Sequence, residues 1–136
     1  MNRNELLVAA REAAHHAHCP YSHFRVGAAL VANGQVYTGV NIEISSYGLT
    51  LCAERAALAV ALSAGAVPGA NAITHIAITC LDAPAGAPDN ERTPCGACRQ
   101  WIADLAPNAT IFIDGIERDM TIHDLLPYAF GLPQPR

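Results

Sequence analysis

The stretch LCAERAALAVALSAG, residues 51–65, is the strongest structural signal in the chain. It is rich in alanine, leucine and valine, so it predicts a helix over residues 51–64 that ends at Gly65. The predicted helix is apolar on nearly every side, and we therefore expect it to be deeply buried. Its first turn nevertheless holds the polar or reactive side chains of Cys52, Glu54 and Arg55. A buried helix that begins with such residues is the first candidate for a functional site.

Further helices and strands are predicted on both sides of this helix. Apolar residues recur at helical spacing over residues 4–18, with Asn4 as the expected N-cap. Asn33-Gly34 is a typical hairpin turn. The other predicted elements are strands over 26–32, 35–40 and 73–80, an exposed loop over 81–93, a helix over 96–105, strands over 110–113 and 116–120, and a short helix over 121–126. This order predicts an α/β sandwich around a mixed sheet.

The composition indicates one compact domain over residues 1–136, because 51% of the residues are apolar and only 15% are charged. The net charge is −4, and the eight basic residues are scattered arginines without a basic stripe. This distribution argues against a nucleic-acid polymer as partner. Neither a signal peptide nor an apolar run of about 18 residues is recognisable. We therefore expect no membrane partner and a cytoplasmic location.

Two short motifs carry the clearest chemical signal: Cys52-Ala53-Glu54 and Pro94-Cys95-Gly96-Ala97-Cys98. Five cysteines, an odd number, indicate metal or redox chemistry in an unexported protein more than a disulfide framework. Each motif places cysteine at the start of a predicted helix, where the positive end of the helix favours the thiolate. Three thiolates bind tetrahedral zinc and leave its fourth position to water, which is typical of a catalytic site.

Glu54 follows a predicted zinc ligand by two residues, a position that suits general acid–base catalysis beside a zinc-bound water. The combination of ligand-x-Glu with Pro-Cys-x-x-Cys is the layout of the zinc deaminases. Cys95 stands 43 positions after Cys52, which is too far for a zinc knuckle and fits two helices of one fold. The two motifs together therefore predict a catalytic zinc.

Two arginines adjoin the predicted ligands. Zinc with three thiolates carries a formal charge of −1 and is a weak Lewis acid, so hydrogen bonds to sulfur would draw charge from the metal. Arg55 and Arg99 are the candidates for this role. Cys19 and Cys80 are interpreted as buried small apolar residues. The crowded histidines His15, His16, His18 and His23 are interpreted as a solvated helix face and not as a second metal site.

These and three further motifs make the chain similar to the small homotetrameric zinc-dependent cytidine deaminases over nearly its whole length. The motifs that carry the resemblance are CPYSHFRVGAA at 19–29, NIE at 41–43, CAER at 52–55, PCGACRQ at 94–100 and LLPYAF at 125–130. The resemblance implies a three-layer α/β/α sandwich with a central mixed five-stranded sheet. It also implies one Zn²⁺ per subunit and a homotetramer whose active sites borrow residues from neighbouring subunits.

The resemblance also assigns substrate-binding residues. Asn41 and Glu43 match the pair that binds the ribose hydroxyls, although Asn41 at a strand end is also open to a purely structural interpretation. Phe24 matches the aromatic residue that packs on the pyrimidine, and Phe130 matches one from another subunit; either is also a possible core residue. Ala53 is also assigned to substrate binding, and Ser45 and Tyr47 match positions that reach a neighbour's ribose.

The implied reaction is hydrolytic deamination of cytidine or deoxycytidine, or of related N4-modified nucleosides, to the uridine product and ammonia. It proceeds through a zinc-bound hydroxide with Glu54 as proton shuttle. Two departures leave the substrate open: Ile44 replaces a second asparagine of the family, and the loop over 82–93 is longer than usual.

Three alternatives stay open at this point. The chain could be a deaminase of a cytosine nucleoside antibiotic of the blasticidin type, so that its purpose is either pyrimidine salvage or resistance. It could be a structural zinc module with a fourth protein ligand, or a deaminase that edits nucleic acid. The negative charge argues against the last of these.

Overall fold

The computed structural model describes residues 1–69 and 71–133. Its elements in chain order are α1 (Arg3–Ala14), β1 (Val26–Ala32), β2 (Gln35–Val40), the 3₁₀ turn η1 (Tyr47–Leu49), α2 (Ala53–Ser63), β3 (Ile73–Cys80), the 3₁₀ turn η2 (Asp89–Glu91), α3 (Gly96–Leu105), β4 (Thr110–Ile113), β5 (Ile116–Met120) and α4 (Ile122–Leu125). None of the helices in these residues is long and apolar enough to cross a bilayer.

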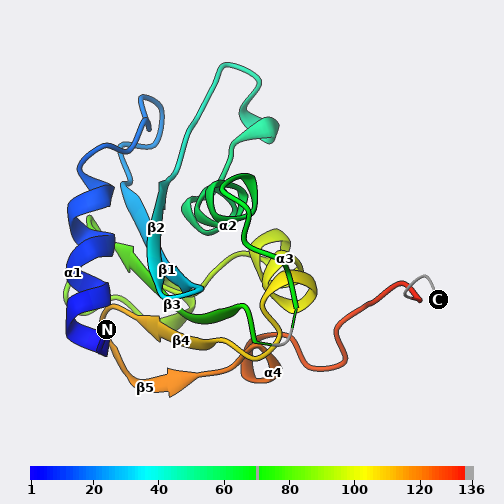
Figure 1. Cartoon of the computed structure of the whole chain (residues 1–136). Coiled ribbons are helices and arrows are strands. Elements are labelled where there is room, and N and C mark those ends of the chain that lie inside the picture. Colours follow the sequence, from blue (N-terminus) through cyan, green and yellow to red (C-terminus); the bar gives the residue numbers. More distant parts are fainter. Residues whose placement is uncertain (70, 134–136) are drawn as a thin grey trace.

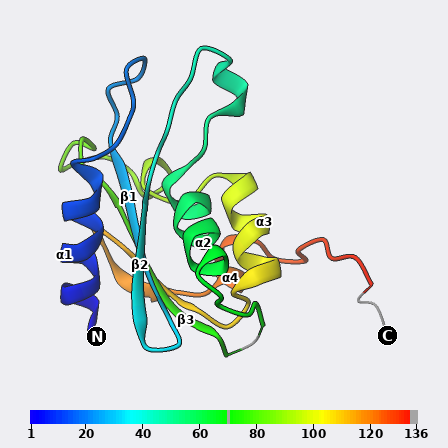
Figure 2. The same ribbon diagram turned by 45° about the horizontal axis from the view of Figure 1, so that its top comes forward.

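The five strands form one mixed sheet in the order β2-β1-β3-β4-β5. β3 and β4 pair in parallel, and every other neighbouring pair is antiparallel. Helix α1 covers one face of the sheet, while α2 and α3 lie side by side on the other face (Figures 1 and 2). The predicted three-layer α/β/α sandwich with a central mixed five-stranded sheet is therefore confirmed.

Two glycines let the helices approach the sheet closely. A Cβ atom on Gly27 of β1 would lie 2.1 Å from the Ala10 carbonyl oxygen of α1. A Cβ atom on Gly39 of β2 would lie 2.3 Å from the Ala57 nitrogen of α2. Because no side chain fits at either position, each helix packs directly on the strand backbone. The contact at Gly39 sets the height of α2, and thus of its first turn, above the sheet.

The main apolar core lies between the sheet and the layer of α2 and α3, and a smaller cluster lies between the sheet and α1. Ala57, Leu58 and Ala61 of α2 are fully buried, as its composition predicts. The expected deep burial of α2 therefore holds for this side of the helix, whereas Val60 on the same helix is 46% exposed. The apolar side of α2 that faces away from the sheet has no cover within the described residues.

The first helix differs from its predicted bounds at both ends. Asn2, not Asn4, is the N-cap, and it forms a capping box with Glu5. The helix ends at Ala14, although the helical spacing continues to His18. His18 instead forms a β-bridge with Ile42, and its amide donates to the Asn41 carbonyl over 3.0 Å. This long-range pairing draws residues 15–18 out of the helix toward the loop after β2.

Candidate active site

The three predicted zinc ligands come together at the starts of two helices. Cys52 is the N-cap of α2, Cys95 is the N-cap of α3, and Cys98 lies in the first turn of α3. Their sulfur atoms all lie within 4.8 Å of one another, and the distances from Cys95 Sγ are 3.7 Å to Cys52 Sγ and 3.6 Å to Cys98 Sγ. A tetrahedral zinc with Zn–S bonds of about 2.3 Å requires sulfur separations of about 3.8 Å. The three sulfurs therefore fit one zinc ion.

The electrostatics of the cluster favour the thiolate form that a metal needs. Hydrogen bonds from the Cys98 thiol and from Arg55 lower the pKa of Cys52 to about 5, against the opposing effect of burial. Cys98 is fully buried, whereas Cys95 is exposed. A zinc at this point is thus held from the protein side and remains open to solvent on the other, which is the arrangement of a catalytic site.

Arg55 contacts a ligand sulfur directly. Its Nη2 donates to Cys52 Sγ over 3.2 Å and to the Thr50 carbonyl oxygen over 3.2 Å. The Arg55 Nε is buried and has no hydrogen-bond partner among the described residues. The guanidinium therefore donates its hydrogen bonds to the ligand sulfur and to the backbone that precedes α2.

We expect Arg55→Gln to lower zinc affinity, turnover, or both by about 10–100-fold, the usual effect of removing a group that hydrogen-bonds a metal ligand. The matched control is Arg118→Gln, because Arg118 is an exposed arginine on β5 whose ion pair with Asp124 is long, at 3.8 Å. Metal analysis and steady-state rates on the same samples measure both effects. Unchanged zinc content and unchanged turnover in Arg55→Gln would remove the arginine from the metal site.

The structure differs from the prediction for Arg99, which donates to oxygen atoms instead of to sulfur. Its Nε donates to the Pro94 carbonyl over 2.7 Å, its Nη2 to Thr93 Oγ1 over 3.1 Å, and its Nη1 to the Leu125 carbonyl. The expected contact with a thiolate is therefore wrong. Arg99 instead ties the segment before Cys95 to the end of α4, so it acts on the backbone that positions the ligand.

Glu54 lies in the first turn of α2 and is only 5% exposed. Burial, with a smaller contribution from the nearby Cys52 thiolate, raises the pKa of Glu54 to about 7 against the lowering effect of its own backbone N–H. A carboxyl group that titrates near neutral pH both accepts and donates protons readily. The side chain adjoins the sulfur cluster and lines the same cavity as Cys52 and Cys95.

This cavity has a volume of about 200 Å³ and lies between the start of β1, the start of α2 and the segment before α3. It contains three of the residues that were assigned to substrate binding: Phe24, Asn41 and Ala53. The other lining residues are Val26, Thr50, Ile78, Cys80, Glu91, Arg92 and Thr93. None of them was predicted as a site residue, and Cys80, which was interpreted as a buried apolar residue, is only partly buried. Cys80 and Ile78 stand at the carboxyl end of β3, where α/β sheets commonly place sites, and this signal was available in the sequence.

The side chain of Asn41 joins two strand ends. Its Oδ1 accepts from the Val26 amide over 2.9 Å, and its Nδ2 donates to the Phe24 carbonyl over 2.8 Å. These bonds match the structural interpretation of Asn41 and fix Phe24 at the cavity. The amide keeps one N–H and one acceptor position for a further partner.

Glu43 is 3% exposed and is not among the cavity-lining residues. It accepts hydrogen bonds from Ser22 Oγ over 2.6 Å, from the Tyr21 and Ser22 amides over 3.1 Å each, and from Tyr47 Oη over 3.4 Å. These donors, led by the Ser22 hydroxyl, hold the pKa of Glu43 below its usual value. Glu43 is therefore an ionised carboxylate that anchors the loop of residues 20–23.

Three further assigned residues lie away from the cavity. Ser45 Oγ is 3.0 Å from Tyr21 Oη, and Tyr47 is 53% exposed. Phe130 is 70% exposed on the segment after α4, where its carbonyl accepts a hydrogen bond from Gln100 of α3 over 2.7 Å. One chain therefore brings together the metal ligands, Glu54, Phe24, Asn41 and Ala53, and it leaves these three outside.

An α/β/α sandwich with three thiolates at two helix starts and a buried glutamate beside them defines the class of zinc-dependent hydrolases that deaminate nucleobases. Residues 1–113 match the family model described as the cytidine and deoxycytidylate deaminase zinc-binding region. The chain belongs to this family, as the sequence motifs predict. It is therefore a zinc-dependent enzyme of the deaminase class, and Cys52, Cys95 and Cys98 form a cluster that could hold one zinc.

Relatives match almost the whole chain. A cytidine deaminase of Halalkalibacterium halodurans is 43% identical over 96% of this chain and 95% of its own length. A cytidine deaminase of Mycobacterium tuberculosis is 42% identical over 95% of this chain and 90% of its own length. The crystal structure of a cytidine deaminase from Burkholderia pseudomallei superimposes with a TM-score of 0.84 at 43% identity, covering 96% of this chain and 100% of that one.

Proposed function

We propose that the protein catalyses the hydrolytic deamination of cytidine and deoxycytidine, which converts each to its uridine counterpart and ammonia. The observation that carries this proposal is the position of Glu54, buried at a three-sulfur metal site and open to a cavity of about 200 Å³. The names of the relatives support the choice of cytidine. A structural zinc module would need neither the carboxyl group nor the cavity.

In the proposed reaction, zinc supplies a water molecule activated for attack at C4 of the ring. Glu54 accepts a proton as that water attacks and delivers it to N3. It then passes the second proton to the amino group, which leaves C4 as ammonia while the new C–O bond becomes the carbonyl of uracil. With its pKa at about 7, Glu54 performs both transfers near neutral pH. Phe24 and Ala53 flank the ring in the cavity.

We assign the ribose to Asn41 and Glu43, and the remaining contacts to neighbouring subunits. The segments that carry Ser45, Tyr47 and Phe130 project from the body of the chain (Figures 1 and 2). Their aromatic side chains are exposed, as are Val60 and part of Trp101 on the outer face of the helices. These features support a homotetramer with shared active sites, in which each subunit is a single domain. A cytoplasmic location stays a prediction.

Ammonia release across a panel of nucleosides tests this function. The panel contains cytidine, deoxycytidine, N4-alkyl cytidines and blasticidin S, with metal analysis and the mass of the assembly determined on the same sample. We expect cytidine and deoxycytidine to be the best substrates. A clear preference for blasticidin S would favour the antibiotic deaminase, for which Ile44 at the family's asparagine position is the motivating departure.

A further inference from the structure

Arg92 is a buried arginine whose role the proposed chemistry does not explain. It stands near the end of the loop over 81–93 and is only 9% exposed. Its guanidinium donates to two backbone carbonyls, that of Pro84 within the same loop and that of Asp114 over 3.4 Å. It forms no ion pair with a carboxylate in the described part of the chain. The planar fork of the guanidinium thus joins the loop to the turn between β4 and β5.

The turn has a glycine where the guanidinium rests. Gly115 has a φ of +92°, and a Cβ atom there would lie 2.6 Å from Arg92 Nη1 and 2.8 Å from its Cζ. Only glycine leaves room for this contact and also takes this backbone conformation without strain. Asp114, the residue before Gly115, adds a second contact, because its carbonyl accepts the hydrogen bond from Arg92.

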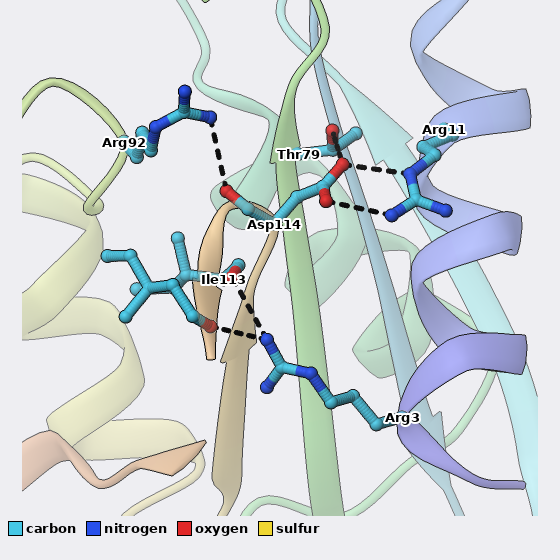
Figure 3. Close-up of polar contacts among 7 residues, drawn as sticks. Arg3, Arg11, Thr79, Arg92, Ile113 and Asp114 are labelled. Atoms are coloured by element: carbon cyan, nitrogen blue, oxygen red, sulfur yellow. Dashed lines mark hydrogen bonds and ion pairs between the residues drawn. The ribbon is translucent and has the colours of Figure 1, made fainter. Parts of the chain in front are cut away.

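The turn is itself held from the opposite layer of the fold (Figure 3). The Asp114 carboxylate accepts two hydrogen bonds of 2.8 Å from Arg11 of α1 and one of 2.8 Å from Thr79 Oγ1 of β3. Arg3 of α1 donates to the Ile113 carbonyl on the same turn over 3.3 Å. The β4–β5 turn that Arg92 contacts is therefore fixed in place by α1 and by the sheet.

Arg92 and the residues on either side of it form the part of the loop that lines the cavity. Glu91, Arg92 and Thr93 line it, whereas residues 83–90 do not. The three lining residues directly precede Pro94 and the zinc ligand Cys95, so they bound the cavity on the metal side. In a hydrolytic deamination the attacked carbon carries the amino group, and that carbon must lie next to the metal-activated water. The amino group of the substrate therefore faces this wall.

We propose that Arg92 is a positioning residue that makes residues 91–93 a rigid wall, and that this wall excludes cytosine nucleosides with a substituent on the amino nitrogen. The loop over 82–93, which is longer than usual for the family, then narrows the active-site cavity instead of widening it. The inference rests on the proposed function for the identity of the substrate. The docking of Arg92 on Gly115 is independent of any activity and is testable by itself.

The first test is a double-mutant cycle on thermal unfolding of the zinc-loaded protein. Gly115→Ala introduces both backbone strain and a clash with Arg92, whereas Gly34→Ala in the β1–β2 turn, with a φ of +77° and no atom within 4 Å, introduces the strain alone. We expect Gly115→Ala to lower the unfolding midpoint more than Gly34→Ala does. In an Arg92→Ala background this excess should disappear. Equal effects of Gly115→Ala in both backgrounds would overturn the docking.

The second test compares kcat/KM for cytidine and N4-methylcytidine in the wild type, Arg92→Ala, Arg92→Lys and the exposed control Arg118→Ala. One methyl group in a fitted pocket changes kcat/KM by about 10–200-fold. We expect the preference for cytidine to fall at least about tenfold in Arg92→Ala at unchanged zinc content, with partial recovery in Arg92→Lys. The control should keep the wild-type ratio.

A ratio in Arg92→Ala within about twofold of the wild type would overturn the proposed wall, because a residue that only stabilises the fold does not alter discrimination between substrates. Failure of the wild type to deaminate either nucleoside would instead defeat the proposed function. The unfolding cycle would then still decide whether Arg92 is seated on the turn. The two failures are therefore distinguishable.

Discussion

Glu54→Gln is expected to reduce turnover by at least about 10²–10⁴-fold, the usual contribution of a general acid–base group, while zinc stays bound. Glutamine has the size and shape of glutamate but cannot accept and release a proton near neutral pH. The substitution replaces a buried, ionisable group by a neutral one at 5% exposure, so we expect the unfolding midpoint to stay the same or rise. Loss of activity will thus not be caused by unfolding.

The measurement is the rate of ammonia release per bound zinc, beside the same value for Glu117→Gln. Glu117 is an exposed glutamate on β5, and its substitution should leave the rate unchanged. Glu54→Gln with zinc bound and a rate within tenfold of the wild type would contradict the assignment. Loss of zinc together with activity would show that Glu54 supports the metal site and not the proton transfers.

The residues that carry the chemistry were predictable because local sequence fixes where they stand. Cys52, Cys95 and Cys98 lie at helix starts, and a helix start has a defined direction and spacing in any fold. The strands over 26–32 and 73–80 and the helix over 96–105 also have their predicted bounds, since turn residues or prolines adjoin them. Short-range signals were sufficient for both the metal site and the sheet.

The missed features depend on contacts between distant parts of the chain. Residues 15–18 continue a helical pattern, yet His18 pairs with Ile42 instead. Arg99 is adjacent to a ligand in sequence, but its guanidinium is used by carbonyls on another helix and loop. Arg92 gave no signal at all, because its burial depends on Gly115, which is 23 positions away. Such contacts arise from the packing of distant segments, and they leave no periodic pattern in the local sequence that would predict them.

Arg99 supports the zinc ligand Cys95 without contacting its sulfur atom. The segment before Cys95 is held by Arg99 through Pro94 and Thr93, and on its other side by Arg92. Cys95 is exposed, so burial does not hold it in place. Its place in the metal site therefore depends on the backbone that these two arginines fix, whereas Cys98 is held by its burial in α3.

Cys98→Ser should abolish both zinc binding and turnover, and its effect should exceed the about 10–100-fold typical of residues that contact a ligand. Serine is close in size but its hydroxyl is not deprotonated near neutral pH, so only two thiolates would remain for the metal. Because the loss of a buried ligand also removes the stabilisation that bound zinc gives the folded state, we expect a lower unfolding midpoint that added zinc does not restore.

The matched control for Cys98→Ser is Cys19→Ser, which places the same change at a buried cysteine that is not among the residues lining the active-site cavity. That variant should keep one zinc per chain and wild-type turnover even if it unfolds at a lower temperature. Zinc content is measured after dialysis, and turnover is measured with and without added zinc. Full zinc occupancy in Cys98→Ser would mean that a fourth side chain replaces the sulfur, and the three-thiolate site would then have to be abandoned.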